Sequence, residues 1–200
     1  MRYELGVICA RLQPLHKGHI LLINEALKQC ETVYLCVGSA TESRTGRNPF
    51  NWSERFVMVK TVFPAEGKPN ILFLADINDP PRWPSHVMDK VIDAYGKTPK
   101  SVVFIGGSES DVSLYKDKWE TIVVDRSESE LLSGTELRSL LTGLNPKWKE
   151  YVPFQLHEMV EAVFQSIILK NFAYKMVSSQ QDIDPELHMM LLDKRKKFLL

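Results

Sequence analysis

The chain has 200 residues, and its hydrophobic share of 44% and charged share of 25% are ordinary for a folded globular protein. Its 25 basic residues equal its 25 acidic ones, which argues against nucleic acid or a membrane surface as a partner. The sequence contains no apolar run long enough to cross a bilayer and no signal-peptide pattern, and its three cysteines lack metal-site spacing. We therefore expect a cytoplasmic protein with one main domain.

Strand-like and helix-like segments alternate through the first 125 residues. The strand-like runs are short, apolar and rich in β-branched residues, as strands buried on both faces of a parallel sheet are. Two intervening segments, 52–63 and 87–95, have the apolar spacing of helices. This alternation predicts an α/β fold with a doubly wound, mostly parallel sheet and right-handed crossovers. The expected strands are 5–10, 32–39, 70–75, 101–106 and 121–125.

The pattern changes near residue 151, where apolar residues begin to recur at helical spacing from Phe154 to Phe172. We expect an α/β domain over residues 1–153 and a helical extension over residues 154–200. The apolar stripe of this extension either closes the core of the monomer or forms an interface with a second copy. The sequence leaves the oligomeric state open between these two.

Two histidines, His16 and His19, follow the first strand-like run, with Gly18 between them. A helical pattern begins at Ile20, so the end of a strand and the start of a helix meet at this point. Ligands bind at such strand ends in open α/β sheets, and a helix N-terminus attracts phosphate. Gly18 lets the backbone approach a ligand, and both imidazoles can donate hydrogen bonds to phosphate oxygens. The alternatives are a pair of metal ligands or an ordinary helix start.

Arginines and a helix cap supply two further candidate phosphate contacts. Arg44 and Arg47 lie in the loop after the second expected strand, where they either bind phosphate or are simply solvated. Ser133 and Glu136 have the spacing of a capping box, which predicts a helix that begins near residue 134. Arg138 lies one turn into that helix. A plain cap with no ligand is the alternative there.

Several motifs carry a family resemblance. The run from His16 to His19, after a first strand, resembles the signature of the nucleotidylyltransferase superfamily. A second group of motifs resembles the nicotinamide-mononucleotide adenylyltransferases, both the archaeal type and the halves fused to Nudix domains. The resemblance covers about residues 1–155, and no Nudix motif follows, so we expect no hydrolase. The second group is Gly38-Ser39-Ala40, Asn48-Pro49-Phe50 and Glu54-Arg55. Ser133-Gly134-Thr135 with Arg138 resembles a further motif of the superfamily as a whole.

The resemblance implies a Rossmann-like fold and the transfer of AMP from ATP to nicotinamide mononucleotide, which gives NAD and pyrophosphate. It implies Mg²⁺ as a cofactor that arrives with ATP, and no metal ligands from side chains. Trp83 is the implied stacking partner of the pyridine ring. The implied catalytic residues are Arg11, His16, His19 and Arg138; the phosphate-binding residues Gly18, Arg47, Gly106, Gly107, Ser133 and Thr135; and the pyridine-nucleotide residues Ser39, Ala40, Ile77, Asn78 and Trp83.

The loop 106–111 departs from the archaeal pattern, which has Gly-Asn-Pro there. With Ser110, Tyr115 and Trp119 it is more similar to the Nudix-fused type. Two alternatives to the main hypothesis stand: an adenylyltransferase with another acceptor, such as phosphopantetheine, and a nucleotide-sensing module without turnover. The sequence does not decide between nicotinamide and nicotinic acid mononucleotide.

Overall fold

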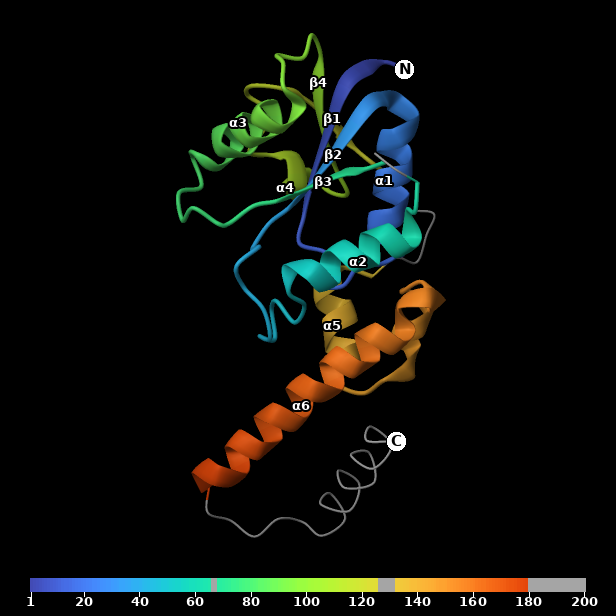
Figure 1. Ribbon diagram of the computed structural model, residues 1–200, viewed down its shortest axis with the longest axis vertical. Helices are drawn as coiled ribbons and strands as arrows, with labels where there is room; N and C mark the ends of the chain where they lie inside the picture. Colours follow the sequence, from blue (N-terminus) through green and yellow to red (C-terminus); the bar gives the residue numbers. More distant parts are fainter. Residues whose placement is uncertain (66–67, 126–131, 180–200) are drawn as a thin grey trace.

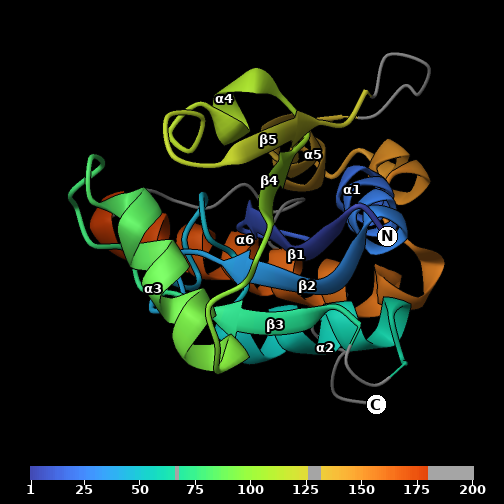
Figure 2. The same ribbon diagram turned by 90° about the horizontal axis from the view of Figure 1, so that it is seen from above.

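The computed structural model describes residues 1–65, 68–125 and 132–179, with side chains described as far as residue 171. Within these residues five parallel strands form one sheet in the order β3-β2-β1-β4-β5 (Figure 2). Strand β1, at the centre, pairs with β2 on one side and β4 on the other. The strands are β1 (Tyr3–Ala10), β2 (Cys30–Val37), β3 (Asn70–Phe73), β4 (Val102–Gly106) and β5 (Glu120–Val123).

Helices cover both faces of the sheet (Figure 1). One apolar cluster joins the sheet to α1, α2, α5 and α6, and a second cluster joins it to α3 and the segment after α4. The doubly wound parallel fold expected from the sequence is therefore confirmed. The helices are α1 (Lys17–Gln29), α2 (Trp52–Val62), α3 (Trp83–Tyr95), α4 (Glu109–Val112), α5 (Gly134–Thr142) and α6 (His157–Ser179), with 3₁₀ turns at Pro146–Glu150 and Phe154–Leu156.

The structure moves several expected boundaries. The apolar spacing of residues 87–95, with Pro84-Ser85 ahead of it, predicts a helix that begins at Pro84-Ser85, and α3 begins one residue earlier, at Trp83. Pro84 occupies its first turn, where the missing N–H needs no partner. Helix α1 begins at Lys17 rather than near Ile20, which places His19 inside its first turn. Strand β3 ends at Phe73, two residues earlier than expected. Each difference concerns an element end, where apolar periodicity carries the least information.

The apolar stripe of the C-terminal segment packs on the chain's own core. Val160 and Phe164 of α6 are buried in the cluster that also holds residues of α1 and α2, and the rings of Phe164 and Phe50 lie 5.8 Å apart. Phe154, expected to start the stripe, lies in a 3₁₀ turn instead and is 76% exposed. The domain boundary after residue 153 stays a prediction, and residues 180–200 of the extension lie outside the described part. None of the described helices is long and apolar enough to cross a membrane.

Candidate active site

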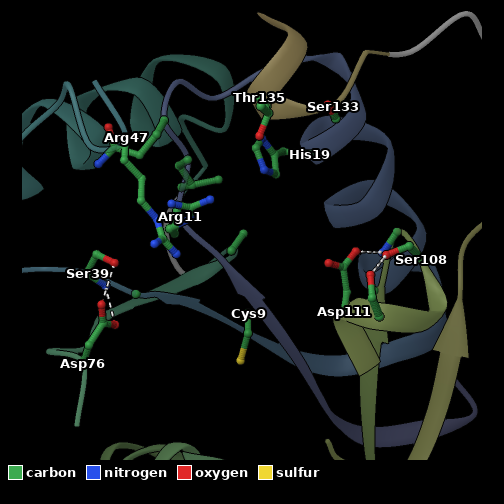
Figure 3. Close-up of a pocket in the computed structure, with 18 of the residues that line it drawn as sticks. Cys9, Arg11, His19, Ser39, Arg47, Asp76, Ser108, Asp111, Ser133 and Thr135 are labelled. Carbon is green, nitrogen blue, oxygen red and sulfur yellow. Dashed lines mark hydrogen bonds between the residues drawn. The ribbon is translucent and has the colours of Figure 1, made fainter. Parts of the chain in front are cut away.

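A cavity of about 730 Å³ lies at the carboxyl ends of β1, β2 and β4 (Figure 3). The chain leaves β1 toward β2 on one side and returns to β4 on the other, and this reversal opens a crevice at the sheet edge. The N-termini of α1 and α5 also reach the cavity. All the site residues expected from the sequence line it except Ala40, whose N–H instead donates to the Leu74 carbonyl at 3.0 Å.

The two histidines lie together at the start of α1. His16 is the N-cap, and its Nδ1 accepts a hydrogen bond from the Gly18 N–H at 3.1 Å. A neutral His16 must then carry its proton on Nε2. The His19 ring lies 3.8 Å from the His16 ring, centroid to centroid, and both rings line the cavity. Gly18, expected at the phosphates, lines the cavity, but its N–H is used in the cap.

Helix α5 begins as predicted, with a capping box. Ser133 Oγ accepts from the Glu136 N–H at 3.2 Å, and the Glu136 carboxylate accepts from the Ser133 N–H at 2.8 Å. A Cβ added at Gly134 would lie 3.3 Å from Arg138 Nη1 and 3.7 Å from His16 Nε2. The glycine therefore keeps the helix start open between a guanidinium and an imidazole.

Three arginines, Arg11, Arg47 and Arg138, line the cavity from three different segments (Figure 3 labels the first two). Burial, together with the charge of Arg47, lowers the pKa of Arg11, and burial with the charges of both other arginines lowers the pKa of Arg138. Arg11 Nη1 is buried and has no hydrogen-bond acceptor among the described residues. The arginines thus repel one another, and an anion with several charges would relieve that repulsion.

Arg44, weighed with Arg47 as a phosphate ligand, has a structural role instead. Its guanidinium donates to Glu54 at 2.8 Å and to the Pro49 carbonyl at 2.9 Å. Glu54 also completes the capping box of α2. Arg44 therefore ties the loop to α2, and it is absent from the cavity lining, so Arg47 is the loop arginine placed to meet a ligand.

Arg55 and Asp76 fix the turn at the end of β2. Arg55 is fully buried and donates to the carbonyls of Gly38 at 2.8 Å, Ser39 at 3.0 Å and Arg11 at 3.0 Å. Asp76 accepts from the Ser39 N–H at 3.0 Å and from Ser39 Oγ at 2.7 Å (Figure 3). Ser39 has a φ of 50°, which is unfavourable for a residue other than glycine. The family resemblance points to Arg55 through the Glu54-Arg55 motif and to the Asp76-Ile77 turn as part of the nicotinamide site, but it gives no indication of their contacts with the turn at Ser39.

The wall near β3 holds Trp83 with Ile77 and Asn78. Trp83 Nε1 donates to the Tyr115 hydroxyl at 3.0 Å, and that hydroxyl donates to Cys9 Sγ at 3.2 Å. This chain of hydrogen bonds holds the indole at the cavity wall. Trp83, the residue expected to stack on a pyridine, therefore lines the cavity with its Nε1 engaged by Tyr115.

The 106–111 loop forms the opposite wall. A Cβ at Gly106 would lie 2.6 Å from Val112 and 2.8 Å from Asp111, so glycine is required for α4 to pack there. The Gly107 N–H donates to Asp111 Oδ2 at 3.1 Å. This backbone group, expected to bind ATP, thus already has an acceptor in its own loop, and Ser108 and Ser110 present hydroxyls beside it.

The part of the chain that the structure describes contains no group of three or more His, Cys, Asp or Glu side chains able to hold a metal ion. The cavity instead gathers guanidinium and imidazole donors, which bind phosphate oxygens. This donor set fits a divalent cation that arrives on a nucleotide's phosphates.

Comparison with known proteins agrees with this geometry. A family model described as cytidylyltransferase-like matches residues 7–181. The nicotinamide-nucleotide adenylyltransferase of Thermococcus kodakarensis is 29% identical over 89% of this chain and 93% of its own length, and that of Pyrococcus horikoshii is 28% identical over 89% and 94%.

Solved structures share the fold. A bifunctional NMN adenylyltransferase/ADP ribose pyrophosphatase of Francisella tularensis, complexed with AMP and a manganese ion, matches 92% of this chain with a TM-score of 0.67 and 22% identity. The chain spans 58% of that protein's length. A NadR protein in complex with NAD and AMP-PNP matches 70% of this chain and 43% of its own, with a TM-score of 0.52 and 19% identity. With a family model over most of its length and this shared fold, the chain belongs to the cytidylyltransferase-like family.

Proposed function

We propose that the protein is a nicotinamide-nucleotide adenylyltransferase, which transfers AMP from ATP to nicotinamide mononucleotide and forms NAD and pyrophosphate. The observation that carries the proposal is the convergence of Arg11, Arg47 and Arg138 with His16 and His19 in one cavity at two helix N-termini. Such an array suits a triphosphate beside a second phosphate. The names of the archaeal relatives, similar over nearly their whole length, support the choice of substrate.

The chemistry needs positioning rather than a protein nucleophile. An oxygen of the mononucleotide's 5′-phosphate attacks the α-phosphorus of ATP, a new P–O bond forms, and the bond to the β-phosphate oxygen breaks. The attacking phosphate is already anionic at neutral pH, because its second pKa is about 6. No general base is therefore required, and the charge that develops on pyrophosphate is what the site must stabilise.

In this proposal each donor has a defined part. His16 Nε2 and His19 contact the α- and β-phosphates as the bond to the leaving group breaks. Arg138 and the open start of α5 at Gly134 hold the β- and γ-phosphates. Arg11 and Arg47 bind the remaining phosphate oxygens, including those of the mononucleotide.

The divalent cation is part of the substrate, as the metal complex of ATP. We propose Mg²⁺, which keeps most of its water ligands and binds phosphate oxygens without a dedicated protein cage. It neutralises part of the triphosphate charge. The arginines then meet the charge that remains, and the protein supplies orientation.

The pyridine ring would lie against Trp83, near Ser39 and Asn78. A positively charged nicotinamide over an indole face gains about 1–2 kcal/mol once water is excluded. Phosphopantetheine offers no such ring, so this wall favours the pyridine acceptor. A cytoplasmic location, expected from the composition, belongs to the same proposal.

The deciding experiment measures pyrophosphate release from ATP and Mg²⁺ with three acceptors in parallel: nicotinamide mononucleotide, nicotinic acid mononucleotide and phosphopantetheine. We expect release with a pyridine mononucleotide and formation of the matching dinucleotide. Release with phosphopantetheine alone would show that the proposed acceptor is wrong and that the proposed adenylyl transfer is right. ATP binding without release for any acceptor would favour a nucleotide sensor.

A further inference from the structure

Two cysteines face each other across neighbouring strands beneath the cavity. Cys9 of β1 and Cys36 of β2 are direct register partners in a parallel pair. Neighbouring strands lie about 4.8 Å apart, within the range of about 4.4–6.8 Å between Cα atoms that disulfides span. Register partners project toward the same face of a sheet, and both side chains belong to the same apolar cluster. The backbone therefore already holds the pair at bonding range.

The two thiols differ in access. Cys9 is half-buried and lines the cavity, where Figure 3 shows it on β1 between the Ser39 side and the Ser108 side. Cys36 is only 1% exposed. A small reagent that enters the cavity thus meets Cys9 first, and Cys36 lies directly behind it.

Hydrogen bonds activate the accessible thiol. The Tyr115 hydroxyl donates to Cys9 Sγ at 3.2 Å. The hydrogen bond with Cys36, together with that from Tyr115, lowers the pKa of the Cys9 thiol even though burial opposes this, and the pKa of Cys36 is raised well above its ordinary value. Because the thiolate is the reactive form, Cys9 is the nucleophile of the pair and Cys36 is the second thiol.

We propose that Cys9 and Cys36 form an oxidation site for small hydroperoxides at the wall of the cavity. The Cys9 thiolate attacks one peroxide oxygen, the O–O bond breaks, and a sulfenic acid and hydroxide form. The Cys36 sulfur then attacks the Cys9 sulfur, the S–S bond forms, and the sulfenic oxygen leaves as water with the Cys36 proton. In sum, two thiols and one hydrogen peroxide give a disulfide and two waters.

Oxidation would disturb the pyridine wall, a consequence that rests on the proposed function. A disulfide draws Cys9 Sγ toward Cys36 and away from the Tyr115 hydroxyl that donates to it, and this hydroxyl in turn accepts from Trp83 Nε1. The indole then loses its fixed position. We expect the oxidised protein to bind the mononucleotide acceptor less well while it keeps its ATP contacts on α1 and α5.

The test maps the thiols of the full-length protein by mass spectrometry. The protein is treated with hydrogen peroxide, the remaining thiols are alkylated, and the peptides are identified without reduction. We expect a cross-linked pair of the Cys9 and Cys36 peptides, two mass units lighter than their sum, which dithiothreitol reverses. Cys30 is the internal control, because it is buried with a pKa raised to about 11 and is expected to stay reduced.

Variants separate the steps. In Cys36→Ser we expect oxidation of Cys9 to stop at the sulfenic acid, which a dimedone probe traps. In Cys9→Ser we expect Cys36 to stay reduced. Cys30→Ser is expected to form the Cys9–Cys36 disulfide as the wild type does. A wild-type protein whose Cys9 stays reduced as long as Cys30 would overturn the site. So would peroxide that oxidises Cys36 equally in Cys9→Ser. These mass measurements need no turnover, so they stand even where the adenylyl transfer fails.

Discussion

Arg55, on α2, holds the backbone of Arg11 at the end of β1: its Nη1 donates to the Arg11 carbonyl at 3.0 Å. The same nitrogen donates to the Gly38 carbonyl at the end of β2. One fully buried guanidinium thus joins two strand ends, and Arg11 at the first and Gly38 and Ser39 at the second line the cavity. The position of the Arg11 side chain depends on this contact, although Arg55 does not line the cavity itself.

Replacement of Arg55 by lysine is therefore expected to lower kcat/KM. The loss should exceed what a smaller folded fraction of the enzyme would cause. A lysine keeps the charge but cannot reach three carbonyls in one plane, so Arg11 and Ser39 lose their fixed positions. We expect Arg55→Lys to stay folded with raised KM values, and Arg55→Met to lose about 3 kcal/mol of unfolding free energy, because buried carbonyls stay unpaired. Urea unfolding and steady-state kinetics measure the two effects, with the exposed Arg2→Lys as control. Normal kinetics for Arg55→Lys would contradict the positioning role.

Asp76 is expected to set the affinity for the mononucleotide. Its two oxygens hold both the N–H and the hydroxyl of Ser39, whose φ of 50° is costly without them. Asp76→Ala should raise the Kd for nicotinamide mononucleotide about tenfold and leave the Kd for ATP within about twofold, since the loss of a charge-assisted hydrogen bond costs about 1.5–3 kcal/mol. Isothermal titration measures both constants, and Asp93→Ala on the exposed face of α3 is the control. Equal losses for both ligands would disprove the assignment.

His19 is expected to act on the transition state. Removal of a donor that contacts developing negative charge lowers kcat by about 10²- to 10³-fold. His19→Ala should show this loss, while the melting temperature and the affinity for nicotinamide mononucleotide stay close to those of the wild type. Lys17→Ala, in the same helical turn and exposed, controls for changes at the start of α1. Turnover of His19→Ala at the wild-type rate would disprove the role.

Arg138 is expected to lower the stability of the ligand-free protein and to contribute to the binding of anions. Burial and two neighbouring arginines lower its pKa, which means that the folded state disfavours its charge. Arg138→Met should therefore melt no lower than the wild type without ligand, yet lose most of the thermal shift that inorganic pyrophosphate gives. At 100 times the Kd, such a ligand stabilises by about 2.7 kcal/mol. Scanning calorimetry with and without pyrophosphate measures the shift in melting temperature, with the exposed Arg82→Met as control. A shift in Arg138→Met as large as in the wild type would contradict the role of Arg138 in anion binding.

Glu4, which lies far from the cavity, is expected to make the stability of the fold depend on pH. The hydrogen bond from Lys97, then those from the Lys100 N–H and the Tyr95 hydroxyl, lower its pKa from 4.5 to about 2. Because the folded pKa lies below the unfolded one, the stabilisation is complete above about pH 4.5 and declines as the pH falls toward 2. Glu4→Gln should thus melt below the wild type at pH 7, and the difference should shrink under pH 4.5. Melting curves from pH 7 to pH 3, with the exposed Glu31→Gln as control, measure it.

The strands and the site motifs could be predicted because each leaves a local signature. Apolar runs identified all five strands, and the spacing of Ser133 and Glu136 predicted the start of α5. The residue pattern by itself treats Arg44 and Arg47 alike, and only the family resemblance selects Arg47. The fold supplies the physical reason, because the acceptor of Arg44 is Glu54, ten residues further along the chain.

The supports of the site could not be predicted, since they act across the sequence. The contact between Arg55 and the Arg11 carbonyl spans 44 residues, and that between Asp76 and Ser39 spans 37. Neither residue type by itself indicates a buried partner. Similarly, the Gly38-Ser39-Ala40 motif predicts that a flat base approaches this backbone, yet the turn at Ser39 directs the Ala40 N–H to the Leu74 carbonyl.

The crowding of guanidinium groups around the cavity also bears on how the reaction ends. A chain with no net charge overall concentrates three arginines around one cavity, and under the proposed function these would hold the leaving pyrophosphate as well as the incoming nucleotide. We therefore expect release of pyrophosphate, rather than the chemical step, to limit kcat. Moderate salt should then raise kcat, because dissolved ions screen the attraction between the arginines and the departing pyrophosphate.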